Sequence, residues 1–235
     1  MRPFATPILL ATALGAAPAA AAPVADLLEA VASNARFAVP TRADVTIERR
    51  KDAHATLGAA VLVGRGQTLY VETRDGTRAL VRPSKIVVQE NGRAVRARPG
   101  ARLGATDLLL EDLVPIGPWS LKLPQVSDEG PTGTVVTGAP AIASTRVLVV
   151  LTIDPESHVV TRTKYYEKSI SDLAAFRRDE DFVDVDGHAR ATRITVDRTR
   201  DETSTQLGLS WRPAPQAIRD LFTLRGLRAP SPIAW

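Results

Sequence analysis

The strongest constraint on the fold of this chain is an alternation of apolar and polar residues that recurs through most of its length. Such alternation places one set of side chains on each face of a strand. Turn dipeptides such as Asp75-Gly76 and Asn91-Gly92 separate the alternating segments, which is typical of antiparallel hairpins. The pattern predicts strands at residues 45–47, 59–63, 69–71, 79–81, 86–88, 146–153, 159–167, 172–178, 190–197 and 203–211.

Two segments change to a helical period. Residues 24–37 form an amphipathic pattern that must end before Pro40, and residues 107–113 (DLLLEDL) place Leu109, Leu110 and Leu113 on one helical face. Glu111 and Asp112 are expected to form the polar face of that short helix. Residues 127–138 are rich in Gly and Pro and show no period, so they are predicted to be a crossover loop.

The strands have one apolar and one charged face, so one side of the sheet must be covered. Two short helices are too few to cover a sheet of eight or more strands, which favours a sheet that curls around itself. The sequence therefore predicts an α+β fold, an incomplete antiparallel β-barrel with a helical lid. Residues 22–235 are expected to form one domain.

The first residues have the pattern of an export signal. Arg2 precedes an uncharged apolar run over residues 4–22, and small residues at positions 19–21 suit a signal peptidase. Pro7 and Pro18 interrupt the run, and its strongly apolar part is short, which disfavours a membrane anchor. We expect residues 1–21 to be a cleaved signal peptide and the rest to be exported.

No motif for catalysis or nucleotide binding is found. The chain has no cysteine, and its three histidines (His54, His158 and His188) lack the spacing of a helical metal pair. A net charge of +4 without basic blocks and an aromatic content of 5% disfavour nucleic-acid binding. We expect no catalysis, no cofactor and no metal. A hydrolase that uses these histidines is kept as a further hypothesis beside those given below.

Acidic residues cluster at positions 179–181, 184 and 186. Such a cluster could supply oxygen ligands to calcium, but the glycine and the closing glutamate of a calcium-binding loop are missing. A solvated turn between strands is the preferred interpretation.

Three stretches together resemble one known family: TDLLLEDL at 106–113, KYY at 164–166 with VDG at 185–187 and Arg193-Ile194, and LFTLRGL at 221–227. In this order and spacing they resemble the outer-membrane lipoprotein-sorting family, the LolA-like periplasmic carriers. The resemblance spans nearly all of the exported chain. It implies an unclosed barrel in the periplasm, whose concave face takes up acyl chains or another hydrophobic ligand.

The leading hypothesis is thus a periplasmic carrier that binds lipid or lipidated protein for transfer to the outer membrane. It is expected to be a monomer and to interact with an inner-membrane transporter. The alternatives are a barrel whose interior is simply a filled core, and a secreted module that docks on a membrane complex. Helical and strand periods place these residues toward the ligand: Leu28, Val31, Leu69, Val71, Leu109, Leu113, Val149, Leu151, Val159, Tyr165, Ile194, Val196, Leu207 and Leu209.

Overall fold

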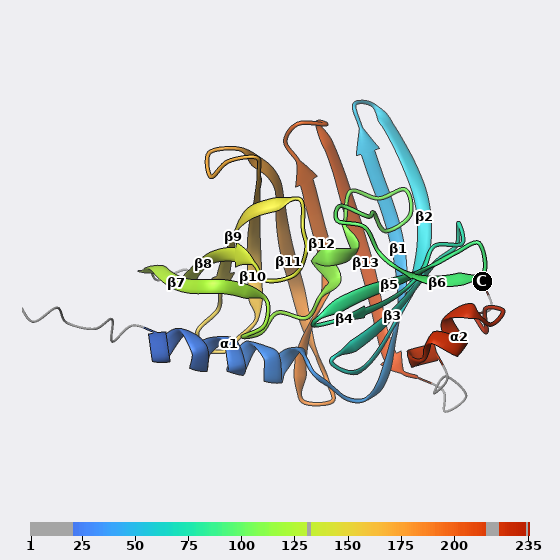
Figure 1. The fold of residues 1–235 in the computed structure, drawn as a ribbon, viewed down its shortest axis with the longest axis horizontal. Coiled ribbons are helices and arrows are strands. Elements are labelled where there is room, and N and C mark those ends of the chain that lie inside the picture. The colour runs from blue at the N-terminus through green and yellow to red at the C-terminus, as the bar shows by residue number, and fades with distance from the viewer. Residues whose placement is uncertain (1–20, 131–132, 215–220, 234) are drawn as a thin grey trace, which may run out of the picture.

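A computed structural model describes residues 21–130, 133–214, 221–233 and 235. Its described residues form one antiparallel sheet of 13 strands in the order β6-β5-β4-β3-β2-β1-β13-β12-β11-β10-β9-β8-β7. The sheet is strongly curved and its two edge strands do not pair, so the barrel stays open (Figure 1). The predicted signal peptide, except for Ala21, lies outside the described residues.

The strands run from β1 (Phe37–Lys51) and β2 (His54–Gly66) to β13 (Thr203–Pro213). Each strand predicted from the alternation overlaps one of them. The others are β3 (Thr68–Thr73), β4 (Arg78–Arg82), β5 (Lys85–Glu90), β6 (Arg93–Arg96), β7 (Leu121–Gly130), β8 (Gly133–Pro140), β9 (Arg146–Ile153), β10 (Val160–Glu167), β11 (Leu173–Val185) and β12 (His188–Arg198).

The chain builds the sheet as two runs of hairpins that meet in its middle. The first run goes outward from β1 to the edge strand β6, and the second returns inward from the opposite edge strand β7 to β13. The strand β13 then pairs with β1, for example Leu209 with Val45. Residues 97–120 connect the two edges. The succession of hairpins is therefore interrupted once, and the first and last strands become central.

Two sequence predictions about local structure are wrong. Residues 127–138 are not a loop, because β7 and β8 occupy most of that segment. Earlier in β7, Pro124 lies at a shift in register between Lys122 and Gln125, an irregularity that an edge strand tolerates. The acidic residues at 179–181 and 184 are not in a turn either, since they continue β11, and Asp179 is paired with Arg177. Asp186 does lie in the turn after β11, as predicted.

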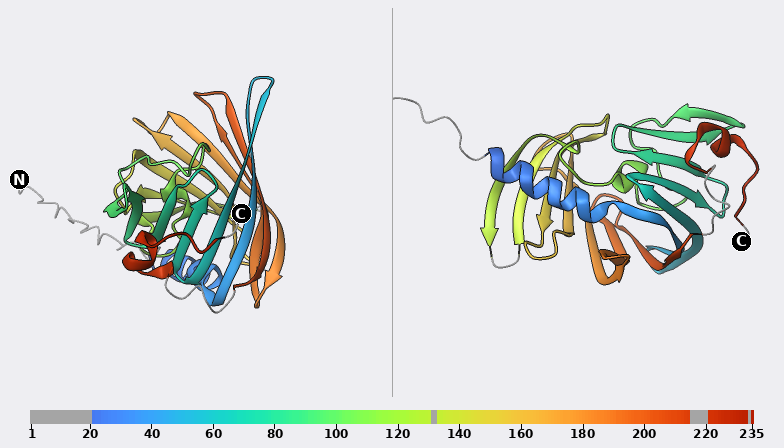
Figure 2. Two further views of the ribbon diagram at one scale, coloured as in Figure 1. Left: turned by 90° about the vertical axis from the view of Figure 1, so that its right-hand side faces the viewer. Right: turned by 90° about the horizontal axis from the view of Figure 1, so that it is seen from below.

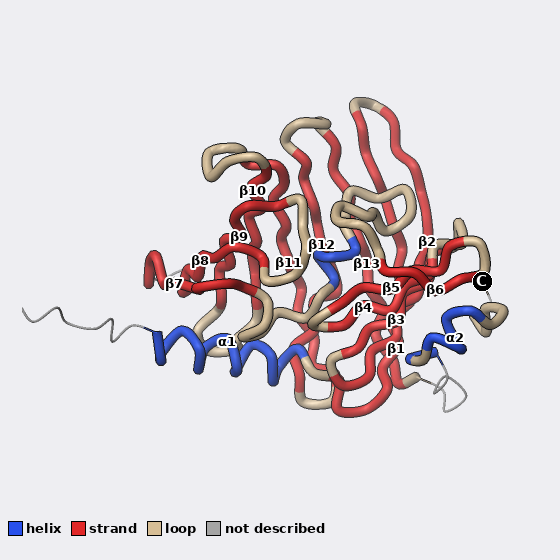
Figure 3. The backbone as a smooth tube through the Cα atoms, viewed as in Figure 1, coloured by secondary structure: helices blue, strands red, loops and turns tan. Residues whose placement is uncertain are grey.

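Helical structure is sparse (Figure 3). The predicted N-terminal helix is present as α1 (Ala21–Ala35), which lies beneath the curved sheet and contacts β7 and β12 (Figure 2). The second predicted helix is only a 3-10 turn, η1 (Leu110–Leu113), and Leu109 before it is extended. No helix of the described ranges has both the length and the apolar character needed to span a membrane.

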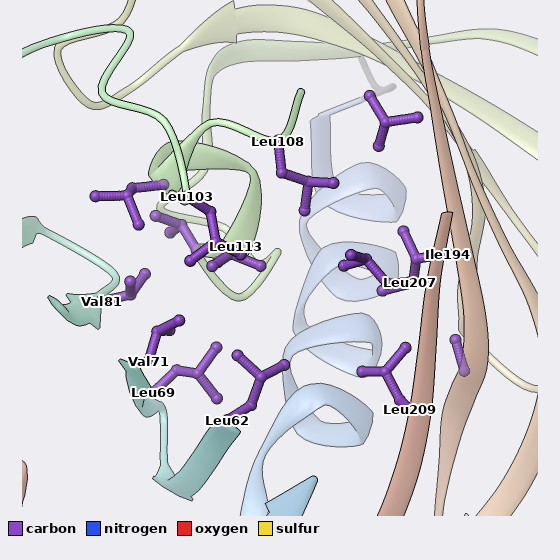
Figure 4. Packing of buried hydrophobic residues seen from close by; sticks show 14 of the residues in the cluster. Leu62, Leu69, Val71, Val81, Leu103, Leu108, Leu113, Ile194, Leu207 and Leu209 are labelled. Carbon is purple, nitrogen blue, oxygen red and sulfur yellow. The ribbon is translucent and has the colours of Figure 1, made fainter. Parts of the chain in front are cut away.

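The main core lies on the concave side of the sheet. In Figure 4, Leu62, Leu69 and Val71 of one flank face Ile194, Leu207 and Leu209 of the other. Leu103, Leu108 and Leu113 of the 97–120 connection reach into the same space. The concave face is thus covered by α1 and by this connection, which carries η1.

A second, smaller core lies on the convex side of strands β2 to β5, which form the first flank of the sheet. Leu221, Leu227 and Ile233 of the C-terminal segment, which contains α2 (Leu224–Arg228), pack with Tyr70 and Leu80 of the sheet. Arg78 and Arg82 donate hydrogen bonds to backbone carbonyls of this segment, at Ala229 and Phe222. The strands β2 to β5 are therefore buried on both faces.

Candidate ligand cavity

A cavity of about 200 Å³ remains inside the concave face and opens to solvent. Its wall is mostly apolar. It is formed by the C-terminal half of α1, by η1 and the residues after it, and by strands from both flanks of the sheet. The lining residues are Val31, Asn34, Ala35, Phe37, Leu62, Leu69, Asp112, Leu113, Val114, Pro115, Ile116, His158, Val159, Val160, Thr163, Tyr165, Arg177, Asp179, Phe182, Ala189, Arg190, Ala191, Ile194, Leu209 and Trp211.

The residues that line the cavity are spread over a long stretch of the sheet. Strands β9 to β12 form the second flank of the sheet. There Thr163 of β10 pairs with Arg177 of β11, which in turn pairs with Val196 of β12. Arg190 lies six residues before Val196, which corresponds to roughly 20 Å of strand. A cavity of about 200 Å³ whose lining residues extend over such a length suits a linear chain better than a compact ligand.

Half of the sequence-predicted residues line this cavity: Val31, Leu69, Leu113, Val159, Tyr165, Ile194 and Leu209. Another six are buried in the main core without lining it: Leu28, Val71, Val149, Leu151, Val196 and Leu207. These six side chains fill part of the concave face, while the C-terminal half of α1 borders the cavity. A separate cavity of about 320 Å³ lies between β1 to β3 and residues 103–106.

Leu109 is the exception. It is buried, but it lies outside the main core, whereas its neighbours Leu108 and Leu110 belong to it. The reason is local, because the backbone at Leu109 is extended and forms a β-bridge with Arg102. In an extended segment alternate side chains point to opposite sides, so Leu108 and Leu110 enter the core and Leu109 does not.

The sequence prediction that Glu111 and Asp112 form an exposed polar face is wrong. Both carboxylates are buried and lie beside Arg146 of β9. Arg146 pairs directly with Asp112, lies 3.7 Å from Glu111, and stacks with its guanidinium carbon 3.4 Å from the centre of the Tyr165 ring. Although burial opposes its charge, Asp112 and Glu111 raise the pKa of Arg146. Burial raises the pKa of Glu111, against the effect of Arg146.

A second arginine, which is only partly exposed, is also matched by a carboxylate. Arg177 of β11 donates two hydrogen bonds of 2.6 Å to Asp179 and one of 2.5 Å to the carbonyl of Asp112. Burial alone lowers the pKa of Arg177, but Asp179 reverses the effect and raises it. The charges at this end of the cavity thus hold η1 against β9 and β11.

A third arginine, Arg190 of β12, lies at the opposite end. Its Nη1 donates a hydrogen bond of 2.8 Å to the carbonyl oxygen of Asn34. Its Nη2 donates one of 2.7 Å to the carbonyl oxygen of Arg36, just after α1. The guanidinium lies 4.4 Å from the centre of the Phe37 ring. Phe37 in turn sits directly on Gly64, where any side chain would overlap the ring.

Sequence reasoning missed all of these charged groups. Arg146 stands at the start of a strand that reads as apolar on both faces, and nothing in the local pattern of Glu111 and Asp112 shows burial.

No family model matches the sequence, and no curated protein matches it either. Solved structures do match. A DUF1329 family protein from Desulfovibrio piger has a TM-score of 0.71 at 16% identity, covering 86% of this chain and 96% of that one. A putative outer membrane lipoprotein-sorting protein domain from Vibrio parahaemolyticus has a TM-score of 0.70 at 12% identity, covering 84% and 95%.

A LolA superfamily protein from Nitrosomonas europaea has a TM-score of 0.63 at 20% identity, covering 82% of this chain and 95% of that one. These structures share the open, curved sheet with nearly the whole of this chain. The resemblance inferred from the three sequence stretches is thereby confirmed at the level of the fold: the chain has a LolA-like fold.

Proposed function

We propose that this protein is a carrier that binds one hydrophobic chain in the cavity between α1 and the curved sheet. The observation that carries the proposal is the mostly apolar cavity of about 200 Å³ within a LolA-like fold. An apolar cavity of about 150 Å³ holds benzene in another protein, so this one admits a short length of hydrocarbon. Six buried methylenes would contribute on the order of 5 kcal/mol at ~0.8 kcal/mol each.

The proposal includes a role for α1 as the lid of the cavity. Val31, Asn34 and Ala35 of α1 line the cavity, while Leu28 is buried in the main core. A longer acyl chain would extend between α1 and the sheet if α1 moved outward. The cavity as it stands would hold only a short length of the acyl chain, and binding of the rest would require α1 to move.

The carrier is proposed to work without catalysis, because burial alone supplies the affinity. The histidines lie apart, with His54 and His188 at the first residues of β2 and β12 and His158 in the turn before β10. Of these, His158 lines the cavity. Arg146 and Arg177 are engaged by carboxylates and hold η1 in place.

Export and destination are part of the same proposal. The sequence pattern of residues 1–21 and the lipoprotein-sorting domain among the structural neighbours support a periplasmic protein that passes lipid or lipoprotein acyl chains to the outer membrane. It would act as a monomer and receive its ligand from an inner-membrane transporter. A secreted docking module remains the alternative function, for which the described residues offer no comparable observation.

The test uses two neighbouring residues on β12 whose side chains face opposite sides. Ile194 lines the cavity, whereas Arg193 is 43% exposed and pairs with Glu180 and Asp181. Ile194→Trp should fill the cavity and abolish binding of a fluorescent acyl probe, while Arg193→Glu should leave it intact. Mass spectrometry of organic extracts from the purified wild-type protein should show lipid.

A filled, inert barrel would give a different result. The proposal is contradicted if no lipid copurifies and the wild type takes up no probe, or if a folded Ile194→Trp binds the probe as the wild type does. Circular dichroism and the unfolding midpoint of each variant show whether it is folded.

A further inference from the structure

We propose that the ligand is a single acyl chain with an anionic headgroup, and that Arg190 binds this headgroup at the α1 end of the cavity. The inference rests on the proposed function, because it names the chemical class of the hydrophobic ligand. It starts from an arginine whose surroundings differ from those of the other arginines at the cavity.

Arg190 is buried, with 8% of its surface exposed, and it lines the cavity. Its partners are the two backbone carbonyls at the end of α1 and the Phe37 ring. Its Nε is buried without a hydrogen-bond partner. Among the residues that the structure describes, no carboxylate lies within ion-pair distance of this guanidinium.

The contrast with the other end of the cavity is direct. Arg146 is paired with Asp112, and Arg177 with Asp179, so those charges are neutralised by the protein itself. A buried charge without a counter-ion is costly, because partial charges on carbonyls replace water only in part. A ligand anion would supply the missing counter-charge at Arg190 and at neither of the other two.

The protonation of Arg190 agrees with this interpretation. Burial lowers the pKa of Arg190 to about 10, and the more distant Asp186 offsets the effect only in part. The guanidinium therefore carries its charge at neutral pH while lacking a full counter-ion. Guanidinium groups bind carboxylates and phosphates through paired, charge-assisted hydrogen bonds.

The position of Arg190 fixes the orientation of the ligand. The cavity lining includes Arg190, Ile194, Leu209 and Thr163, and the positions of Arg190 and Thr163 are roughly 20 Å apart along the strands. A headgroup at Arg190 would thus place an acyl chain along the apolar wall. Both a fatty-acid carboxylate and the phosphate of a single-chain phospholipid have this chemistry.

Arg190 also has a structural role that must be separated from binding. Its two contacts with the last carbonyls of α1 place a positive charge at the negative end of the helix dipole, which stabilises the helix. Such a role alone predicts that changes at Arg190 affect charged and neutral ligands equally. A role in headgroup binding predicts a difference between them.

The experiment compares palmitate, lysophosphatidic acid and the neutral hexadecanol as competitors of a bound fluorescent acyl probe. For the wild type, one or both anions should bind at least tenfold more tightly than hexadecanol, and the more tightly bound anion identifies carboxylate or phosphate as the preferred headgroup. Arg190→Gln should remove this preference, and Arg190→Lys should retain part of it.

Asp186→Asn provides a variant that leaves the cavity wall unchanged. Asp186 has a positive φ of 55° in an exposed turn, a conformation that Asn accepts as readily as Asp. Removal of its negative charge should raise the affinity for the anions by a small factor, up to about threefold, and leave that for hexadecanol unchanged.

The outcomes separate the two proposals. If hexadecanol and the anions bind equally, and Arg190→Gln changes neither or both alike, the headgroup site is refuted while the carrier function stands. If the wild type binds neither the probe nor any of the three amphiphiles, the carrier function itself fails.

Discussion

The two flanks of the curved sheet share one core but differ in what they bury. On the flank of β2 to β5 both faces are packed: Val71 belongs to the main core, and Tyr70 and Leu80 lie beneath the C-terminal segment. On the flank of β9 to β12 the convex face carries exposed charges such as Arg162 and Lys164, and the concave face holds the cavity and the buried ion pairs. Both flanks line the cavity, but the first contributes only apolar side chains such as Leu62 and Leu69, whereas the second also contributes charged ones.

This difference indicates how a small open barrel keeps a cavity without collapsing. Apolar side chains alone tend to close around an empty space, because protein interiors pack densely. On the second flank, Arg146 and Arg177 tie η1 to β9 and β11 by directional contacts, which hold the wall at a fixed distance. The ion pairs are therefore supports for the cavity.

The largest effect is expected at the buried ion pair. Asp112→Ala leaves Arg146 with only the more distant Glu111, and breaking a buried pair costs about 3–5 kcal/mol. The matched control is Asp197→Ala, which breaks a half-exposed pair with Arg178 and should cost less than about 1 kcal/mol. Urea unfolding measures both, and similar losses would contradict the supporting role of the buried pair.

The next effect compares the packed flank with the cavity wall. Leu80→Ala removes a fully buried side chain and should cost about 3 kcal/mol, within the usual range of 2–5 kcal/mol. Leu209→Ala should cost less, because Leu209 borders an existing space and loses fewer contacts. Probe affinity should change in Leu209→Ala alone, and an equal change in folded Leu80→Ala would remove the distinction between the flanks.

The smallest effect concerns the turn that carries His158 and Val159 into the cavity wall. Hydrogen bonds to Asp154, first from the Ser157 hydroxyl and to a smaller extent from backbone amides, lower the pKa of Asp154 below its ordinary value of 3.8. A carboxylate with a lowered pKa in the folded state contributes stability above its unfolded pKa, and this is lost as pH falls through the folded value. Asp154→Ala should therefore cost less than about 1 kcal/mol at pH 7, because the group is exposed.

The difference between Asp154→Ala and the wild type should shrink as the pH falls below 3.8. Unfolding midpoints of the two proteins at pH 7 and at pH 3 measure this change. A gap that widens toward acid would show that the turn is held by contacts other than the charge of Asp154.

The sequence predicted the regular parts of the fold and missed the parts set by tertiary contacts. Strands such as 203–211 alternate strictly, and α1 has a clear apolar stripe, so local patterns were sufficient. Segment 127–138 shows no pattern, because it includes the end of the edge strand β7, whose pairing with β8 is irregular between Val126 and Asp128. The extended course of Leu109 depends on its bridge to Arg102, which no local spacing shows.

The candidate site was predicted in the same uneven way. Ile194, Leu209 and Tyr165 follow from the period of their strands, and the structure places them on the cavity wall. The burial of Asp112 and of Arg190 follows from partners far away in the sequence, at Arg146 and at the end of α1. Charged residues such as these are normally assigned to the surface when the sequence is read alone.

The central claim, that an acyl chain lies in the cavity, is tested most directly by fluorescence from Trp211, which lines the cavity and packs 6.0 Å from Phe37. The chain has three tryptophans, so replacing Trp119 and Trp235 by Phe leaves Trp211 as the only one. Titration with a fatty acid brominated along its chain should quench this emission to saturation, and the unbrominated acid should displace the quencher. Binding of the brominated acid without quenching of Trp211 would contradict the account, because the chain would then lie elsewhere.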